Sequence, residues 1–339
     1  MTNKPSNTTF YTKIVELLQS ARQQVVRSVN QTMVLTYFEI GRRLIEEEQQ
    51  GKERAEYGKQ LLKGLSQILT KEYGRGFSIR NLEQMRKFYL IYTKPQTPSA
   101  ELQPPNFRLS WSHYLILIRI KKVEERKFYE IESQSNNWSV RELKRQFDSS
   151  LYERLVLSRD KKGVKELSEK GQILNVPKDA IKEPYVLEFL GLGEKERYSE
   201  SDLEKAIIDK IEQFLLELGK GFAFVARQKR ISFDERHFFI DLVFYNRLLK
   251  CFLLIDLKIG DLAHQDVGQM QMYVNYYDRE MKLEDENNTI GLILCKEKSE
   301  LLVEYTLPKS NSQIFASRYE TVLPSKKELQ LLLNENESQ

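Results

Sequence analysis

Apolar residues recur at helical spacing through the first half of the chain. They repeat about every 3.6 residues over 10–29, from about 31 to 49 and from about 56 to 73, which predicts three amphipathic helices. Ser78 follows a glycine-containing turn and is a good N-cap for a fourth helix over 79–92. Two helices joined by such a short turn are typical of a helix-turn-helix. The pattern therefore predicts an all-α, winged-helix-like N-terminal half.

The second half of the chain alternates strand-like and helical segments. Runs rich in β-branched and aromatic residues predict strands at 222–232, 237–245, 251–258 and 289–295. The second and third runs flank a short polar connection and predict a β-hairpin. Further helices are predicted at 123–133, after Ser139, at 185–192, from Ser201 to Gly219, from about 264, and after Pro324. A strand that follows a helix implies a crossover, so we expect an α/β domain with a mixed sheet flanked by helices.

A chain of 339 residues is long enough for two domains, each with its own core. Residues 159–184 are charged, poor in large apolar side chains, and interrupted by glycine and proline, which is typical of a connector. We therefore predict a helical domain over 1–165, a connector over 166–185 and an α/β domain over 186–335.

Composition and charge narrow the class of protein. Hydrophobic residues make up 40% of the chain and charged residues 30%, and no apolar run reaches membrane-spanning length, so we expect a cytoplasmic protein without membrane contact. Lys and Arg outnumber Asp and Glu by 25 to 16 in residues 1–150, whereas the remainder has 28 against 33. A basic half beside an acidic half fits a nuclease with a separate grip on nucleic acid, although solvated helix faces produce the same skew. Cys251 and Cys295 lie in strand-like runs, which predicts buried free thiols.

The predicted hairpin carries charged residues where a core strand is normally apolar. If Asn246 and Cys251 are the last pair before the loop, Asp241 lies opposite Asp256, and Lys258 shares their face. Paired carboxylates attract a divalent cation, and hard oxygen ligands suit Mg²⁺ or Mn²⁺. Such a site fits metal-assisted hydrolysis of phosphodiester bonds. The spacing alone fits equally well an Asp–Lys ion pair near a strand end plus one solvated Asp.

These residues resemble a known nuclease signature. Asp241, followed fifteen positions later by Asp256-Leu257-Lys258, resembles the D…(D/E)XK motif of the PD-(D/E)XK superfamily, and Gln269-Met270-Gln271-Met272-Tyr273 is similar to the QxxxY motif of its RecB-like branch. More narrowly, FIDLVFYNRLLKC, GQMQMYVNYYD and IGLILC resemble the YhcG family of bacterial proteins, which join an N-terminal domain of unknown function to a RecB-like nuclease domain. LSWSHY and NNWSVRELKRQ also resemble that family, so the likeness spans almost the whole chain.

The resemblance implies a restriction-endonuclease-like fold and a set of roles. Asp241 and Asp256 would bind the metal, with the Leu257 carbonyl as a backbone ligand, and Lys258 would activate water. Glu204 at the start of a core-facing helical stripe matches an extra acidic residue of the superfamily, but it also suits an acid that complements the helix dipole. Gln269 and Tyr273 would assist, unless they form an ordinary packing stripe. The chain departs from the signature at Ile240, which replaces its proline, and at Asp256, where the family more often has Glu.

Two basic helix faces are candidates for contact with nucleic acid. Arg80, Asn81, Gln84 and Lys87 share the outer face of the helix over 79–92. Arg141, Lys144 and Arg145 form a basic face on the helix after Ser139. Such side chains contact bases and phosphates when a helix enters the major groove, but they also occur on the solvated surface of any helical bundle.

The sequence therefore predicts a metal-dependent nuclease that hydrolyses DNA in repair, recombination or defence against foreign DNA. One alternative is a structure-selective junction resolvase, which requires a homodimer and branched DNA. Another is a non-catalytic DNA-binding or assembly factor that keeps the nuclease fold and works with a repair or defence partner. The sequence does not distinguish DNA from RNA or endonuclease from exonuclease, because a fold does not specify its substrate.

Overall fold

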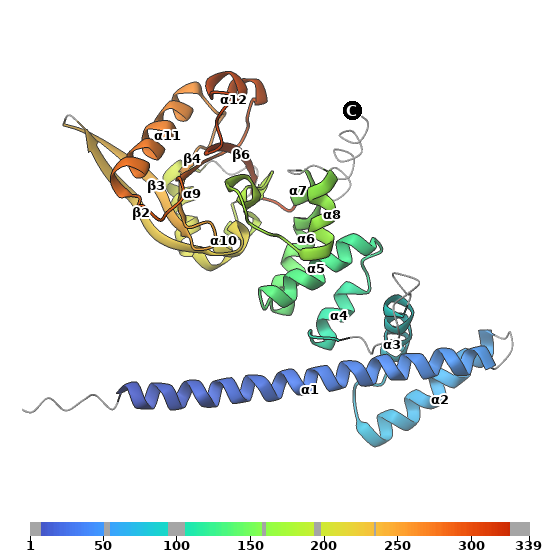
Figure 1. Ribbon diagram of the computed structural model, residues 1–339. Coiled ribbons are helices and arrows are strands. Elements are labelled where there is room, and N and C mark those ends of the chain that lie inside the picture. Colours follow the sequence, from blue (N-terminus) through green and yellow to red (C-terminus); the bar gives the residue numbers. More distant parts are fainter. Residues whose placement is uncertain are drawn as a thin grey trace, which may run out of the picture. The chain divides into compact units, whose positions relative to one another are not determined.

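The computed structural model describes residues 8–50, 55–93, 106–157, 161–192, 198–233 and 235–325 (Figure 1). The chain divides into two compact units, Met1–Leu143 and Lys144–Gln339. Each unit is described by itself below. The helix predicted after Pro324 lies outside the described residues.

The first unit is helical throughout its described residues, as predicted. Its helices are α1 (Thr8–Gln50), α2 (Ala55–Tyr73), α3 (Ile79–Tyr92), α4 (Trp111–Leu117), α5 (Val123–Ser135) and the start of α6 (Val140–Asp148). Ser78 caps α3 by accepting a hydrogen bond from the Asn81 amide at 3.3 Å, so the predicted helix, turn and helix are present. The described part of this unit contains no strand, and the wing of a winged helix is therefore not among these residues.

The structure corrects the prediction of two helices over 10–49, because α1 is a single helix. The chain does not break near residue 30, where the hydroxyl groups of Thr32 and Thr36 bond to carbonyls four residues earlier at 3.0 and 2.9 Å. Toward its end α1 packs closely on α3 through Gly41, where an added Cβ would meet the Met85 backbone. Neither threonine stops the helix, and the two apolar repeats read separately from the sequence belong to one continuous helix.

Aromatic side chains form the core between these helices. Phe88 of α3 lies at the centre, with ring centroids 4.8 Å from Phe107, 5.0 Å from Tyr114 and 5.4 Å from Trp111. Phe38 of α1 packs against Phe88 at 5.8 Å. Aromatic pairs at these separations add to the stabilisation from burial, so this cluster fixes α1, α3 and α4 relative to one another.

The second unit contains a six-stranded mixed sheet (Figure 1). Its strands are β1 (Tyr185–Val186), β2 (Phe222–Phe233), β3 (Arg236–Asn246), β4 (Cys251–Leu257), β5 (Ile290–Cys295) and β6 (Ile314–Glu320), in the spatial order β1-β6-β5-β4-β3-β2. Strands β2, β3 and β4 pair antiparallel, and β4, β5, β6 and β1 pair parallel. The pairing of Asn246 with Cys251 confirms the predicted hairpin register. The predicted α/β fold class is confirmed.

The segment before the sheet differs from its prediction as a short helix over 185–192. Tyr185 pairs with Tyr319 of β6, and the Leu187 amide donates to the Glu320 carbonyl at 2.7 Å, so the chain begins as an edge strand. A 3₁₀ turn (Glu188–Leu190) follows. Apolar residues favoured either element, and pairing with a distant strand decided between them. Ahead of this segment lie the rest of α6, α7 (Leu151–Leu157), α8 (Lys161–Lys170) and a 3₁₀ turn (Pro177–Ala180).

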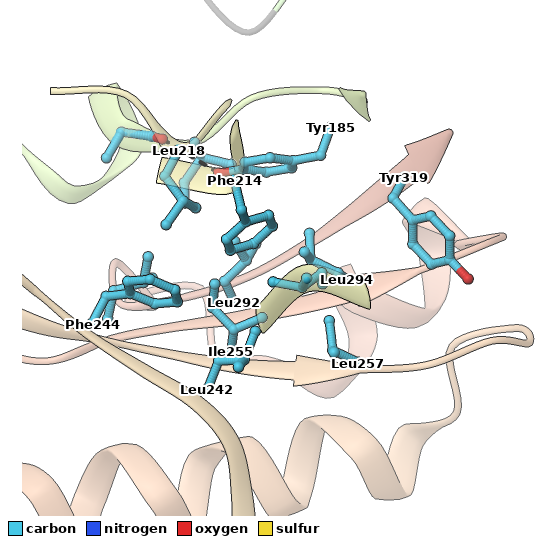
Figure 2. Packing of buried hydrophobic residues seen from close by; sticks show 14 of the residues in the cluster. Tyr185, Phe214, Leu218, Leu242, Phe244, Ile255, Leu257, Leu292, Leu294 and Tyr319 are labelled. Carbon is cyan, nitrogen blue, oxygen red and sulfur yellow. Dashed lines mark hydrogen bonds between the residues drawn. The ribbon is translucent and has the colours of Figure 1, made fainter. Parts of the chain in front are cut away.

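Helices cover both faces of the sheet. On one face lie α9 (Glu200–Asp209) and α10 (Ile211–Leu218), which replace the single helix predicted from Ser201 to Gly219. The break falls at Lys210, whose ammonium group donates to the carbonyls of Phe189 and Leu190 at 2.5 and 3.2 Å. The core beneath them includes Phe214, Phe244, Ile255 and Leu292 (Figure 2).

The opposite face is covered by α11 (His264–Tyr276), followed by a π-helical turn (Tyr277–Met281) and, after β5, by α12 (Glu300–Thr306). Met270 and Tyr273 of α11 pack on Leu254 and Ile293 of the sheet. Cys251 and Cys295 are buried free thiols, as predicted. Asp241 lies in the middle of β3 and Asp256 near the end of β4.

Candidate active site

The candidate site lies where the antiparallel ladder between β3 and β4 ends. The ladder runs from Asn246↔Cys251 to Leu242↔Ile255, while β3 continues its pairing with β2 as far as Arg236. One step past the last pair, Asp241 Oδ2 accepts a hydrogen bond from the Leu257 amide at 2.8 Å. The carboxylate thus replaces the backbone acceptor that a continued strand would supply. The predicted register brings Asp241 to the end of β4, where Asp256 and Lys258 lie.

Asp256 and Lys258 form a largely buried ion pair. Asp256 is only 2% exposed, and its Oδ2 lies 3.0 Å from Lys258 Nζ. Burial raises the pKa of Asp256 to about 7, although the Lys258 ammonium opposes the shift and the Asp241 carboxylate adds to it. Burial alone would lower the pKa of Lys258, but the carboxylates of Asp256, Glu200 and Asp266 together raise that pKa. The Lys258 ammonium therefore offsets only part of the cost of burying the Asp256 carboxylate.

Gln228 joins two of the predicted acidic residues. Its Nε2 donates to Glu204 Oε2 at 2.6 Å and to Asp241 Oδ1 at 2.9 Å, and thereby connects α9 to β3. Its backbone has a φ of +44°, a left-handed conformation that costs about 1 kcal/mol or more for a residue with a Cβ. Arg227 Nε lies 3.3 Å from Glu204 Oε1. No local pattern in the sequence indicates this bridge, because Gln228 and Glu204 lie 24 residues apart.

Gln269 and Tyr273 lie together on the face of α11 that packs against the sheet. Gln269 Nε2 donates to the Tyr273 hydroxyl, which donates to the Phe239 carbonyl at 3.0 Å. Tyr273 is buried, and burial raises the pKa of its phenol. Asp256, Asp241 and Lys258 act electrostatically on that phenol, so α11 belongs to the same site. Asp266 caps α11 by accepting from the Ala263 amide at 2.8 Å and lies 3.9 Å from Lys258 Nζ.

The site residues have the chemistry of a hard-cation site. Within the described part of the chain, the buried atoms Asp256 Oδ2 and Glu204 Oε1 have no well-formed hydrogen bond, although Lys258 Nζ and Arg227 Nε lie 3.0 and 3.3 Å from them. An uncompensated buried carboxylate oxygen is costly unless a further partner satisfies it. No three His, Cys, Asp or Glu side chains among the described residues gather closely enough to hold an ion by themselves. Two carboxylates that leave room for water suit Mg²⁺ or Mn²⁺, which keep several waters when bound.

The first predicted nucleic-acid face is partly exposed. Arg80 and Lys87 are exposed on α3, and Gln84 is half-buried. Asn81 instead holds the unit together, since its Oδ1 accepts from Trp111 Nε1 at 3.2 Å and its Nδ2 donates to the Gly76 carbonyl. Both ends of that amide are therefore engaged within the protein, which leaves Arg80, Lys87 and Gln84 as the available side chains.

The second predicted face loses one of its three members. Arg141 and Lys144 are exposed on α6. The Arg145 side chain is only 14% exposed and forms ion pairs with Glu188 at 3.0 Å and with Glu217 at 3.3 Å. A largely buried guanidinium that is paired with Glu188 and with the fully buried Glu217 does not lie on the exposed basic face, which corrects the prediction for Arg145. Helical periodicity placed it beside Lys144 and could not reveal the acids that reach it from distant segments.

The chain is similar to three known proteins. It is 44% identical over 341 residues to "Putative nuclease YhcG" of Escherichia coli (strain K12), covering 93% of this chain and 90% of that protein. A repair endonuclease from Pyrococcus abyssi is 18% identical, covers 39% of this chain and 50% of its own, and has a TM-score of 0.26. EndoMS in its apo form is 16% identical, covers 39% and 49%, and has a TM-score of 0.25. The chain spans about half the length of these two, and TM-scores this low do not bear on its function.

Family matches cover both halves of the chain. Residues 13–154 match the DUF1016 N-terminal domain, and residues 178–334 match the YhcG PDDEXK nuclease domain. The second match contains Asp241, Asp256 and Lys258 together with Glu204 and the α11 pair. No helix among the described residues is both long enough and apolar enough to cross a bilayer. With this coverage and 44% identity over nearly its whole length, the chain belongs to the YhcG family of PDDEXK nucleases.

Proposed function

We propose that this protein is a metal-dependent deoxyribonuclease that hydrolyses phosphodiester bonds of DNA in repair, recombination or defence. The observation that carries the proposal is the buried Asp256 carboxylate, which lies 3.0 Å from Lys258 Nζ yet has an oxygen without a hydrogen-bond partner among the described residues. A structural ion pair gains little from such a geometry. A site that binds a cation and a charged substrate needs a carboxylate oxygen that the protein has not already satisfied.

The residues present divide the work of phosphodiester hydrolysis. Asp241 and Asp256, with the Leu257 carbonyl, would hold Mg²⁺ or Mn²⁺, and Glu204, which Gln228 connects to Asp241, would assist. When bound, the cation lowers the pKa of water and offsets the charge of the scissile phosphate. The raised pKa of Lys258 favours its ammonium form, which donates hydrogen bonds and so orients the attacking water or a phosphate oxygen.

The helix α11 and the glutamine of β2 support these groups. Tyr273 and Gln269 hold each other and the Phe239 carbonyl next to the site, which limits access of bulk water from that side. Gln228 keeps the Glu204 and Asp241 carboxylates at a fixed separation. We propose Arg80, Gln84 and Lys87 of α3, together with Arg141 and Lys144 of α6, as contacts for the DNA backbone, since their exposure leaves them free to meet phosphates.

Cleavage by purified full-length protein tests the proposal. Wild type, Lys258→Ala and Asp241→Ala are incubated with linear, circular, single-stranded and branched DNA in Mg²⁺, Mn²⁺ or EDTA. We expect cleavage by wild type that EDTA abolishes, and a loss of about 10²–10⁴-fold in Lys258→Ala.

The matched control is Lys250→Ala, because Lys250 is an exposed lysine at the turn between β3 and β4. It removes a positive charge from the same hairpin at the end away from the site, and we expect wild-type cleavage. Equal cleavage by Lys258→Ala and wild type, or cleavage that persists in EDTA, contradicts the proposal.

A further inference from the structure

A cleft lies beside the candidate site, between the far end of the β2–β3 hairpin and α11. Beyond the site the two strands continue to pair from Lys229↔Ile240 to Phe233↔Arg236, and α11 runs alongside them (Figure 1). The cleft between them has a volume of about 810 Å³. Pockets of this size hold small ligands or a few units of a chain ligand.

Aromatic rings form one part of the cleft wall. Phe233 and Phe238 come from the hairpin and Tyr276 from α11. The Phe233 ring is 37% exposed and meets Tyr276 edge-on, with centroids 5.5 Å apart. Phe238 lies 6.4 Å from Phe233. An open ring at the edge of a polar cleft offers a face on which a planar group can stack.

Two arginines and two amides form the rest of the recognition surface. Arg236 at the start of β3 and Arg279 on the π-helical turn are exposed, and neither forms an ion pair or a side-chain hydrogen bond within the described residues. Glu280 is the one acidic residue among those lining the cleft. The Gln271 amide donates to Asn275 at 3.2 Å, which leaves further amide groups to meet the edge of a base. Rings, cations and amides together are the groups that nucleic acid requires.

The cleft and the candidate site both lie along α11. Gly268 and Met272 line the cleft, and each is adjacent in sequence to a site residue, Gln269 or Tyr273. The Tyr273 hydroxyl donates to the Phe239 carbonyl, one residue from Phe238 of the cleft wall. A strand whose phosphate lies at Asp256 and Lys258 would follow α11 to reach the cleft.

We propose that this cleft binds an unpaired segment of the DNA strand that enters the site, with bases stacked on Phe233 and Tyr276 and phosphates held by Arg236 and Arg279. The proposal rests on the proposed nuclease function and adds a preference for single-stranded ends or flaps. Paired bases hide their faces inside the duplex, whereas unpaired bases expose them to aromatic side chains.

Binding of DNA in EDTA tests the cleft without any cleavage. Fluorescence anisotropy with full-length protein compares a labelled single-stranded oligonucleotide with a blunt duplex of the same sequence. The test variant is Phe233→Ala with Arg236→Ala. The matched control is Leu248→Ala with Lys250→Ala, which also removes one exposed apolar side chain and one exposed cation from a hairpin turn of the same unit. Thermal melting followed by circular dichroism shows whether each variant folds.

We expect the test variant to lose about 5- to 100-fold in affinity for the single strand, since stacking on an aromatic ring is worth that factor per base. Its affinity for the duplex should change less than about twofold, and the control should match wild type for both. Equal losses for single strand and duplex overturn the proposal, because they indicate general attraction to phosphate. Unchanged affinities also overturn it.

A second variant and a cross-linking measurement guard against misfolding of the first. Arg279→Glu changes only an exposed side chain on the π-helical turn, and it should weaken single-strand binding alone. Photo-cross-linking of wild type with a 5-iodouracil oligonucleotide should label the peptide that carries Phe233 or Tyr276, and labelling elsewhere counts against the cleft. Loss of single-strand binding in a protein that cleaves no DNA supports the cleft while it contradicts the nuclease function, so the two failures are distinguishable.

Discussion

Two buried carboxylates in the nuclease unit differ sharply in how they are satisfied. Glu217 of α10 is fully buried and accepts hydrogen bonds from Arg154 Nη1 at 2.5 Å, from Arg145 Nη2 at 3.3 Å and from the Val186 amide at 3.1 Å. Asp256 of β4 is nearly as buried, but its Oδ2 has no well-formed hydrogen bond, although Lys258 Nζ lies 3.0 Å from it. The Glu217 carboxylate is thus hydrogen-bonded at both oxygens, whereas the Asp256 carboxylate has one oxygen without a well-formed hydrogen bond.

The electrostatic consequences are opposite. Burial alone would raise the pKa of Glu217, but Arg154, Lys182 and Arg145 lower it to about 2. Burial raises the pKa of Asp256 to about 7, because one ammonium does not compensate for it and Asp241 opposes its ionisation. The fully hydrogen-bonded Glu217 carboxylate fixes α10 to the segments around α6 and β1. The incompletely hydrogen-bonded Asp256 carboxylate can still bind a ligand. The difference separates a structural ion pair from the one to which we assign a function within a single fold.

The largest effect is expected at the fully hydrogen-bonded Glu217 carboxylate. Glu217→Gln removes the charge that balances Arg154, whose side chain is fully buried, and breaking such a pair costs about 3–5 kcal/mol. Urea unfolding in EDTA measures the loss. Glu169→Gln is the control, since Glu169 lies 3.8 Å from Lys165 on an exposed helix face and should change stability by less than about 0.5 kcal/mol. A decrease of less than about 1 kcal/mol in the free energy of unfolding of Glu217→Gln contradicts the contrast between Glu217 and Asp256.

The loss of stability at acid pH should depend on the same carboxyl group, that of Glu217. Because the folded-state pKa of Glu217 lies at about 2, below its ordinary 4.5, its contribution is present above pH 4.5 and is lost as pH falls toward 2. A shift of that size corresponds to about 3 kcal/mol. Urea unfolding at several pH values between 2 and 5 should therefore show a shallower decline for Glu217→Gln than for wild type. Parallel declines would assign the acid sensitivity to other carboxylates.

The same acid-to-amide change should have the opposite sign at the site. Asp256→Asn removes a buried charge that has no adequate partner, so the metal-free protein should become more stable by about 1–3 kcal/mol. Cleavage should be lost in the same variant. Urea unfolding in EDTA measures the stability of the metal-free protein, and urea unfolding in Mg²⁺ measures the stabilisation by the metal. Mg²⁺ should stabilise wild type and not the variant. Destabilisation in EDTA equal to that of Glu217→Gln would show that Asp256 is an ordinary structural residue.

The sequence predicted the elements that depend on nearby residues. The cap of Ser78 on α3, the start of a helix after Ser139, and the hairpin register through Asn246 and Cys251 are all confirmed. Each follows from side chains within a few residues or from strict alternation along a strand. The carboxylates and Lys258 of the site were found for the same reason, because they interrupt an otherwise apolar hairpin.

The remaining features depend on contacts between distant segments. Arg145 is buried by Glu188 and Glu217, which lie 43 and 72 residues away, and no local pattern records them. Gln228 meets Glu204 across 24 residues. The continuity of α1 was missed for a different reason, since the two apolar repeats read separately from the sequence belong to one continuous helix. Periodicity thus locates faces and ends, while the satisfaction of a buried charge requires the folded chain.

The smallest predicted effect concerns the glutamine that connects the two acidic elements. Gln228→Ala removes the amide that holds Glu204 and Asp241 together, so these like charges should separate and Mn²⁺ affinity should fall about tenfold, as for other residues that orient metal ligands. Isothermal titration calorimetry with Mn²⁺ measures this without any turnover, and Gln213→Ala, an exposed glutamine of α10, is the control. Tighter binding by Gln228→Ala would mean that the amide occupies the place of the cation. In that case the bridge would compete with the metal, and Glu204 and Asp241 would resemble the fully hydrogen-bonded Glu217 more closely than the incompletely hydrogen-bonded Asp256.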